Sequence, residues 1–260
     1  MFYFFRFTIR LLFISSIFYS FSHAIEIKNS KSAVDIAGKQ RMYTQRMLKD
    51  YAMIGMKNSF GNPTEDLKVI IGEFEEHLQS LANYSKNKEI KKSTDTIKIL
   101  WEPIKKNLKG KPVKEEVTSL QEKLEELLKA SDTLTHLFAD ESGKNVGKIV
   151  DMSGRQRMLS QRMASLYMLK VWGVNDEKFK EKMDDAMKLF KNSLKTLEES
   201  KMNDKEIKSL LVKVKRSFMF FEIMNRSSST FIPTLIYKKS NDILKNMDLV
   251  TKCYVAIQNN

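Results

Sequence analysis

The sequence predicts an all-α protein built from two tandem four-helix bundles. Only 9 glycines and 4 prolines occur in 260 residues, which disfavours sheets because strands need frequent turn residues between them. Apolar residues recur at helical spacing along most of the chain. The phrase AGKQRMYTQRM, which starts at Ala37, returns as SGRQRMLSQRM, which starts at Ser153. An internal repeat of this kind indicates a duplicated structural unit, and each unit reads as an up-down four-helix bundle.

The N-terminal segment differs in composition from the rest of the chain. Two arginines precede an apolar run over residues 11–21, and small residues at positions 22 and 24 stand where a signal peptidase reads. The apolar run is too short to cross a bilayer comfortably. We therefore predict a signal peptide at residues 1–24 and a periplasmic mature protein that begins at Ile25, with an uncleaved membrane anchor as the alternative.

Four helices are expected in the first repeat, each with an apolar stripe at helical spacing. Thr64 follows a Gly-Asn-Pro loop and can cap the second of them. Pro103 lies inside the third, which it should kink or interrupt. The four predicted ranges are Ser32–Met56, Thr64–Tyr84, Ser93–Leu108 and Val113–Ala139.

The second repeat is expected to follow the same plan. One constant offset, that from Asp35 to Asp151, aligns the apolar positions of the helices without a gap. The first repeat then covers residues 29–144 and the second covers residues 145–260. Within the second, the third helix is predicted around Leu210–Asn225, and Pro233 should lie near the start of the fourth helix.

The repeated phrase presents two different sides of a helix. At about 3.6 residues per turn, Gly38, Arg41 and Gln45 share one side, whereas Tyr43 and Met47 lie on the opposite, apolar side that can face the bundle core. The polar side therefore points away from that core. Its equivalents in the second repeat are Gly154, Arg157 and Gln161.

The residue types on the polar side suit a small planar anion. A glycine inside a helix costs about 1 kcal/mol relative to alanine, so Gly38 and Gly154 indicate the close approach of a helix or a ligand. Arg41 supplies a planar fork of donors, and Gln45 adds neutral donors. The alternative interpretation is structural: the phrases hold the two bundles together, with the glycine as a packing notch and the arginine paired to Asp or Glu.

The two phrases resemble the signature of the PilJ-type sensor domain, the N-terminal domain of type IV pili methyl-accepting chemotaxis transducers. They are similar also to the P-box of the NarX and NarQ nitrate sensor kinases. The resemblance implies an extracytoplasmic four-helix bundle. In the nitrate sensors two subunits pair side by side and hold nitrate between their first helices with one arginine from each. On matching positions the arginines are Arg41 and Arg157, the glycines are Gly38 and Gly154, and the second motif arginines are Arg46 and Arg162.

Taken with the duplication, the resemblance implies a pseudo-dimer within one chain, in which Arg41 faces Arg157 around nitrate or nitrite. Two bare guanidiniums would repel each other, and an anion would relieve that repulsion and change how the bundles sit. This arrangement requires the connection Phe138–Val150 to turn at Gly143 and Gly147. If the connection continued as one helix, the bundles would lie end to end and each phrase would need another molecule, as in a homodimer.

The remaining features narrow the class of function. No transmembrane helix, kinase module or methyl-accepting module follows either bundle, so a signal would pass to a separate membrane-bound sensor or chemoreceptor. The alternative is a ligand-independent helical adaptor for a chemoreceptor, pilus or envelope complex. His77 and His136 are isolated, and no catalytic or metal-binding motif appears, so we expect no enzyme, metal or cofactor. Export argues against nucleic acid as the partner of a chain with net charge +13.

Overall fold

The computed structural model describes residues 25–226 and 232–257, and the predicted signal peptide at residues 1–24 lies outside them. The described part consists of α-helices and one short 3₁₀ turn and contains no strand, which confirms the all-α class. In chain order the elements are α1 (Ser30–Gly55), α2 (Pro63–Tyr84), α3 (Lys88–Lys109), η1 (Lys114–Glu116), α4 (Val117–Glu141), α5 (Lys144–Val171), α6 (Phe179–Glu198), α7 (Lys205–Arg226) and α8 (Pro233–Ala256).

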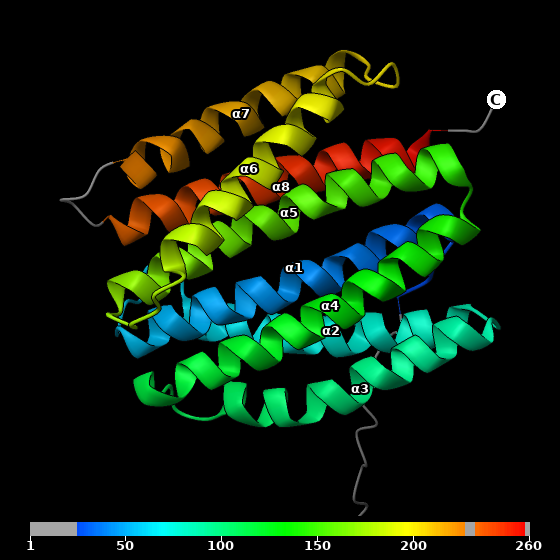
Figure 1. The fold of residues 1–260 in the computed structure, drawn as a ribbon. Helices are drawn as coiled ribbons and strands as arrows, with labels where there is room; N and C mark the ends of the chain where they lie inside the picture. Colours follow the sequence, from blue (N-terminus) through cyan, green and yellow to red (C-terminus); the bar gives the residue numbers. More distant parts are fainter. Residues whose placement is uncertain (1–24, 227–231, 258–260) are drawn as a thin grey trace, which may run out of the picture.

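The helices form two bundles that lie side by side (Figure 1). In the first bundle α1 packs against α2 and α4, and α3 closes the ring between them. In the second bundle α5 packs against α6 and α8, and α7 closes the ring. The most extensive helix–helix contact of the described chain joins α1 to α5, so the first helices of the two repeats form the interface between the bundles.

The chain reverses direction between α4 and α5, as the sequence predicted. Gly143 has a φ of 93°, in the left-handed region that glycine adopts without strain. Gly147 lies within α5, where a Cβ would come within 2.6 Å of the main-chain oxygen of Ala139. The start of α5 therefore packs closely on the end of α4. This turn, in place of a continuous helix, brings α5 beside α1.

The starts of two helices differ from those predicted. α2 begins at Pro63, with no side-chain cap, whereas the sequence suggested a cap by Thr64. Proline is favoured at the first helical position because its missing N–H would have no partner there. α4 begins at Val117, after the separate 3₁₀ turn, and thus later than the predicted Val113.

α3 is longer and more regular than predicted. It begins at Lys88, because the side chain of Asn87 accepts the backbone N–H of Glu89 at 2.8 Å and caps the helix. It also continues through Pro103, which neither ends nor interrupts it. The carbonyl that loses its partner there belongs to Ile99, which is 74% exposed, so water can satisfy it.

The repeat contains a gap that the sequence comparison missed. Trp101 packs on Phe74 with ring centroids 4.4 Å apart, and Phe218 packs on Phe190 at 4.5 Å. Phe190 is the equivalent of Phe74 at the predicted offset, but the equivalent of Trp101 would be Ser217. The buried face of α7 is thus displaced by one residue, and the connection between α6 and α7 accommodates the extra residue.

Both ends of the described chain lie at the same end of the molecule (Figure 1). The ammonium of Lys31, near the start of α1, donates a hydrogen bond to the main-chain oxygen of Ile257, just after α8. Within the described ranges, no helix combines the length and hydropathy needed to cross a membrane. Any change at the α1–α5 interface can therefore reach this common end along the first helices of both repeats.

Candidate functional site

The two repeated phrases meet at the centre of the α1–α5 interface (Figure 1). A Cβ added to Gly38 would lie 3.3 Å from Nη2 of Arg41 and 3.6 Å from Nη2 of Arg157. A Cβ on Gly154 would lie 3.2 Å from Nη2 of Arg157 and 3.5 Å from Nη2 of Arg41. The two guanidiniums thus converge on the space that the glycines leave, and both arginines are fully buried. These four predicted site residues lie together.

Each arginine binds one aspartate of its own bundle and one aspartate of the other bundle. Nη1 of Arg41 lies 2.5 Å from Asp132 on α4, and Nη2 lies 2.7 Å from the carboxylate of Asp151 on α5. The same Nη2 also donates to the main-chain oxygen of Asp151 at 3.4 Å. Asp151 therefore ties the two bundles together through both its side chain and its backbone.

Arg157 repeats this arrangement in the other direction. Its Nη1 lies 2.8 Å from Asp248 on α8, and its Nη2 lies 2.7 Å from the carboxylate of Asp35 on α1. The contacts obey an approximate twofold relation between the repeats. We call the six residues Arg41, Arg157, Asp35, Asp132, Asp151 and Asp248 the arginine–aspartate cluster.

Each guanidinium of the arginine–aspartate cluster contacts two carboxylates in this structure, so the six residues carry two positive and four negative formal charges. Burial raises the pKa of Asp132 and Asp248, but the adjacent arginines outweigh that effect and bring both pKa values below the ordinary range. Burial lowers the pKa of Arg157, and the carboxylates of Asp35 and Asp248 reverse this, so that its pKa is raised. The pairing therefore favours the charged forms of Asp132, Asp248 and Arg157. The two guanidiniums are not bare, contrary to what the sequence suggested, because each contacts two carboxylates that offset their mutual repulsion.

Basic side chains lie beside the two aspartates that cross the interface. Oδ2 of Asp151 is 3.6 Å from Nη2 of Arg155 and 3.6 Å from Nε2 of His136. Asp35 lies 3.7 Å from the ammonium of Lys39. The side chains of Asp35 and Asp151 are 11% and 14% exposed, whereas the arginines are completely enclosed. Either aspartate could leave its arginine and still face a positive charge.

The guanidiniums keep a donor that no described residue accepts. Nε of Arg41 and Nε of Arg157 are buried without a hydrogen-bond partner in the described part of the chain. Two surface grooves reach the arginine–aspartate cluster, one of about 440 Å³ lined by Asp248 and one of about 370 Å³ lined by Asp35. Lys39 lines both grooves. Neither groove is lined by Arg41 or Arg157, so Asp248 and Asp35 separate the grooves from the guanidiniums that they bind.

An identical hydrogen bond anchors each phrase to its own bundle. Nε2 of Gln40 donates to the main-chain oxygen of Phe74 at 3.1 Å, and Nε2 of Gln156 donates to that of Phe190, also at 3.1 Å. These bonds fix the rotation of α1 against α2 and of α5 against α6. The rotation in turn directs both arginines toward the interface.

Gln45 and Gln161 lie one helical turn beyond the arginines, still within the interface. Oε1 of Gln45 accepts the hydroxyl of Ser165 at 3.3 Å, and Oε1 of Gln161 accepts the ammonium of Lys49 at 2.9 Å. Both glutamines thus bridge α1 and α5. They extend the polar interface and do not contact the arginine–aspartate cluster directly.

Arg46 and Arg162 lie apart from the other predicted site residues. Arg46 binds Asp66 on α2, through Nε at 3.1 Å. Arg162 binds Glu125 on α4 of the other bundle, through Nη2 at 2.9 Å. Neither guanidinium points to the space between Gly38 and Gly154, and their partners differ between the repeats.

The four aspartates of the cluster were not among the functional residues predicted from the sequence. Asp132 and Asp248 are the same residue type at equivalent positions of the two repeats, as are Asp35 and Asp151. A search for identical polar residues at the repeat offset outside the phrase would have found the first pair. Among the described residues there is no group of three or more His, Cys, Asp or Glu side chains that could hold a metal ion.

A second buried charge pair occurs in the first repeat only. Lys49 and Asp50 are both fully buried, with Nζ and Oδ1 3.7 Å apart. Burial lowers the pKa of Lys49 and raises that of Asp50 well above its ordinary value. Their equivalents, Ser165 and Leu166, are uncharged. This pair therefore breaks the twofold relation that the arginine–aspartate cluster obeys.

Comparison with known proteins agrees with the geometry of two related bundles. The model of the PilJ family, described as type IV pili methyl-accepting chemotaxis transducer N-term, matches residues 26–134 and 139–217. These segments contain both repeated phrases and most of the two bundles. No curated protein and no solved structure matches the chain. The chain belongs to the PilJ family of chemotaxis-transducer sensor domains, with the repeated arginine phrases placed at the contact between its two bundles.

Proposed function

We propose that this protein is a periplasmic sensor module that binds a small oxyanion, nitrate or nitrite, between α1 and α5 and signals through a separate membrane-bound receptor or kinase. The observation that carries the proposal is the convergence of Arg41 and Arg157 on one space between the helices. A planar oxyanion placed there would accept hydrogen bonds from both guanidinium forks. Membership of a family of chemotaxis-transducer sensor domains supports the sensory part.

Binding would proceed by exchange of carboxylates. In the described state the two Nη2 groups hold Asp151 and Asp35. An incoming oxyanion would take both positions, while Asp151 moves to Arg155 and Asp35 moves to Lys39. The Nη1 pairs within each bundle would keep the guanidiniums in place. Every charge then retains an opposite partner throughout the exchange.

The exchange gives the ligand a means to change the interface. Asp151 and Asp35 tie each bundle to the arginine of the other, and one shared anion would replace both ties. A ligand shifts a conformational equilibrium only through contacts that differ between the two states, and these contacts differ. Because about as many charge-assisted hydrogen bonds are lost as are gained, we expect modest affinity, in the micromolar to millimolar range.

Isothermal titration of the mature protein with nitrate, nitrite and chloride tests the proposal. We expect nitrate or nitrite to bind more tightly than chloride. The double variant Arg41→Lys/Arg157→Lys keeps both charges but loses both forks, and should bind at least about tenfold more weakly. The control is Arg216→Lys, which changes an exposed arginine of α7 in the same way and should bind like the wild type. Absence of oxyanion binding in the wild type would refute the proposal.

A second candidate function follows from the aspartates themselves. Since all four Nη groups of Arg41 and Arg157 already contact carboxylates, the cluster could serve only to fasten the bundles of a helical adaptor. Such an adaptor would capture the same membrane receptor from solubilised envelope with and without nitrate, and nitrate would leave its thermal unfolding temperature unchanged. An increase in that temperature with nitrate, abolished in Arg41→Lys/Arg157→Lys, would exclude this second candidate.

A further inference from the structure

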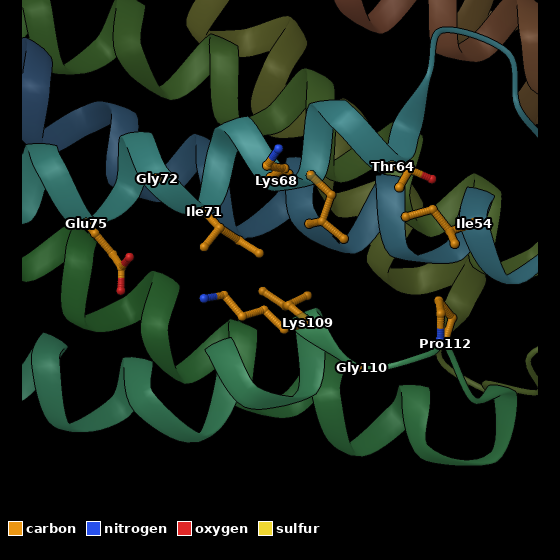
Figure 2. A pocket seen from close by; sticks show the side chains of 11 residues that line it. Ile54, Thr64, Lys68, Ile71, Gly72, Glu75, Lys109, Gly110 and Pro112 are labelled. Atoms are coloured by element: carbon orange, nitrogen blue, oxygen red, sulfur yellow. The ribbon is translucent and has the colours of Figure 1, made fainter. Parts of the chain in front are cut away.

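A pocket of about 420 Å³ lies between α2 and α3 in the first bundle (Figure 2). None of the residues of the arginine–aspartate cluster lines it. Leu67 and Ile71 of α2 and Leu108 of α3 form its apolar wall, and all three are buried. α2 and α3 pack against each other less closely than either packs against its other neighbour in the bundle. The pocket occupies the space that this loose contact leaves.

The opening of the α2–α3 pocket is cationic. Lys68 and Lys109 line it from opposite helices. In Figure 2 Lys109 lies opposite Ile71, and its side chain extends along the pocket in the direction of Glu75. Lys68 forms only an exposed pair with Glu65 at 3.8 Å, and no ion pair within the described residues involves Lys109. Both lysines are exposed, and Lys109 also acts on Glu75. Burial raises the pKa of Glu75, but its hydrogen bonds to Lys105 and Trp101 outweigh burial and bring the pKa below the ordinary value. An anionic group at the opening would meet two positive charges.

One acceptor atom at the far side of the pocket is also available. Oε1 of Glu75 accepts hydrogen bonds from Nε1 of Trp101, at 3.0 Å, and from the ammonium of Lys105. Its other oxygen takes part in no hydrogen bond that the described residues form. The pocket thus presents apolar walls, a cationic opening and a carboxylate whose charge Lys105 already offsets.

Gly72 keeps the pocket open. It lies in the middle of α2, where glycine is unfavourable, and no heavy atom of the described residues lies within 4 Å of the position a Cβ would take. Packing therefore does not require glycine here. The equivalent residue of the second bundle is Lys188. There, Asn225 of α7 donates to Asp184 of α6 at 2.8 Å and spans the matching gap.

We propose that the α2–α3 pocket binds a small carboxylate with a short hydrocarbon body. The hydrocarbon would lie against Leu67, Ile71 and Leu108, where its burial is favourable. The carboxylate would bind Lys109 at the opening, with Lys68 nearby. The pocket is separate from the arginine pair, so the module would have two ligand sites of different chemistry, and only the first bundle would provide the second site.

The probes are 4-methylpentanoate, the alcohol 4-methylpentan-1-ol and acetate, titrated into the mature protein and followed by ligand-observed NMR. We expect 4-methylpentanoate to bind saturably, and the alcohol and acetate each to bind at least about tenfold more weakly, since one lacks the charge and the other lacks the hydrocarbon. Lys109→Met should weaken the carboxylate to the level of the alcohol. Arg41→Lys/Arg157→Lys should leave it unchanged.

Two variants test the location. Gly72→Glu places a negative charge at the opening, and Gly72→Trp fills the opening with an apolar ring; both should abolish binding without lowering the thermal unfolding temperature. Val69→Glu places the same charge at an exposed position of α2 outside the pocket and should bind like the wild type. The proposal is overturned if the wild type does not bind 4-methylpentanoate saturably at millimolar concentration, if the alcohol binds equally well, or if Gly72→Trp still binds.

Discussion

Two neighbouring parts of the α1–α5 interface differ in how closely their contacts repeat between the two bundles. In the arginine–aspartate cluster every contact occurs twice, and both pairs that cross between the bundles measure 2.7 Å. Just over two helical turns after Arg41, Lys49 and Asp50 have the uncharged equivalents Ser165 and Leu166. The cluster lies where each repeat contacts its own equivalent, so a change in one repeat would have to be matched in the other. The Lys49–Asp50 pair lies where the repeats were free to diverge.

The two parts also differ in how well their charges are satisfied. The arginines of the cluster each face two carboxylates within 2.8 Å, whereas Nζ of Lys49 lies 3.7 Å from Oδ1 of Asp50. Among the described residues, both oxygens of Asp50 lack a hydrogen-bond partner, compared with one oxygen each of Asp35 and Asp151. A buried charge pair stabilises a protein only when geometry and further hydrogen bonds offset desolvation. We therefore expect the cluster to hold the bundles together and the Lys49–Asp50 pair to be close to a net cost.

The largest effect is expected from removing one guanidinium. Arg41→Ala and Arg157→Ala each leave two aspartates without their partner, and each should lower the free energy of unfolding by about 3–5 kcal/mol. The two losses should agree within about 1 kcal/mol, since the contacts are equivalent. Urea denaturation measures both. Lys98→Ala, which removes an exposed pair with Asp95, is the control and should cost less than about 0.5 kcal/mol. Clearly unequal losses would show that the cluster is not functionally symmetric.

A smaller effect should come from the asymmetric pair. Lys49→Met removes the larger of the two cationic effects on Asp50, leaves Arg46 one turn away, and should cost about 3 kcal/mol. The double variant Lys49→Ser/Asp50→Leu, which installs the residues of the second repeat, should cost less than the single variant. A double-mutant cycle by urea denaturation measures the coupling. Additive effects would contradict the assignment of this pair as poorly satisfied.

The pH dependence of stability should also distinguish the two bundles, because the buried His77 of the first bundle has the equivalent Ser193 in the second. Burial lowers the pKa of His77 to about 4 from its ordinary 6.5. The unfolded chain then binds a proton at higher pH than the folded protein, so the stability that neutral His77 permits is complete above pH 6.5 and is lost as the pH falls toward 4. The loss should reach about 2–3 kcal/mol. Urea denaturation across this range should show a shallower slope for His77→Ser, which installs the equivalent Ser193; an unchanged slope would rule out His77 as its source.

The smallest effect is expected at the central glycines. The Cβ of Gly38→Ala would meet the side-chain ends of Arg41, at 3.3 Å, and Arg157, at 3.6 Å. Helix propensity would gain about 1 kcal/mol, so the net change should stay within about 1 kcal/mol. Gly55→Ala is the contrast, because its Cβ would lie 2.1 Å from the ring of Trp172 and should destabilise by about 1–3 kcal/mol. Thermal unfolding compares them. A larger loss for Gly38→Ala would mean that the aspartates hold the guanidiniums too rigidly to give way to a Cβ.

Much of the fold could be predicted because its causes are local. Helical spacing of apolar residues, the repeated phrase and Gly143 were enough to indicate two bundles lying side by side. Predictions from local sequence were wrong where contacts with other helices or with solvent determine the structure. Pro103 stays inside a helix because the carbonyl it deprives faces solvent, and the displaced face of α7 shows only in the packing of Phe218.

The candidate site was predictable only in part, for a related reason. Gly38 and Arg41 carry a signal within one phrase, which helical spacing orients. Asp132 and Asp248 lie in distant helices, and nothing in their own neighbourhoods distinguishes them from surface carboxylates. Their pairing with the arginines depends on how four helices meet, so the compensated state of the guanidiniums could not be read from the phrase alone.

The most direct test of the carboxylate-exchange mechanism uses Asp35→Asn/Asp151→Asn. If an oxyanion competes with these two aspartates for the same donors, removing their charge should make nitrate or nitrite bind at least about tenfold more tightly, a gain of about 1.4 kcal/mol in isothermal titration. Glu65→Gln/Asp95→Asn, which removes two exposed charges elsewhere, corrects for the general change in net charge. Tighter binding in the first variant alone is the predicted result, and equal or weaker binding than in the wild type would contradict an oxyanion site between Arg41 and Arg157.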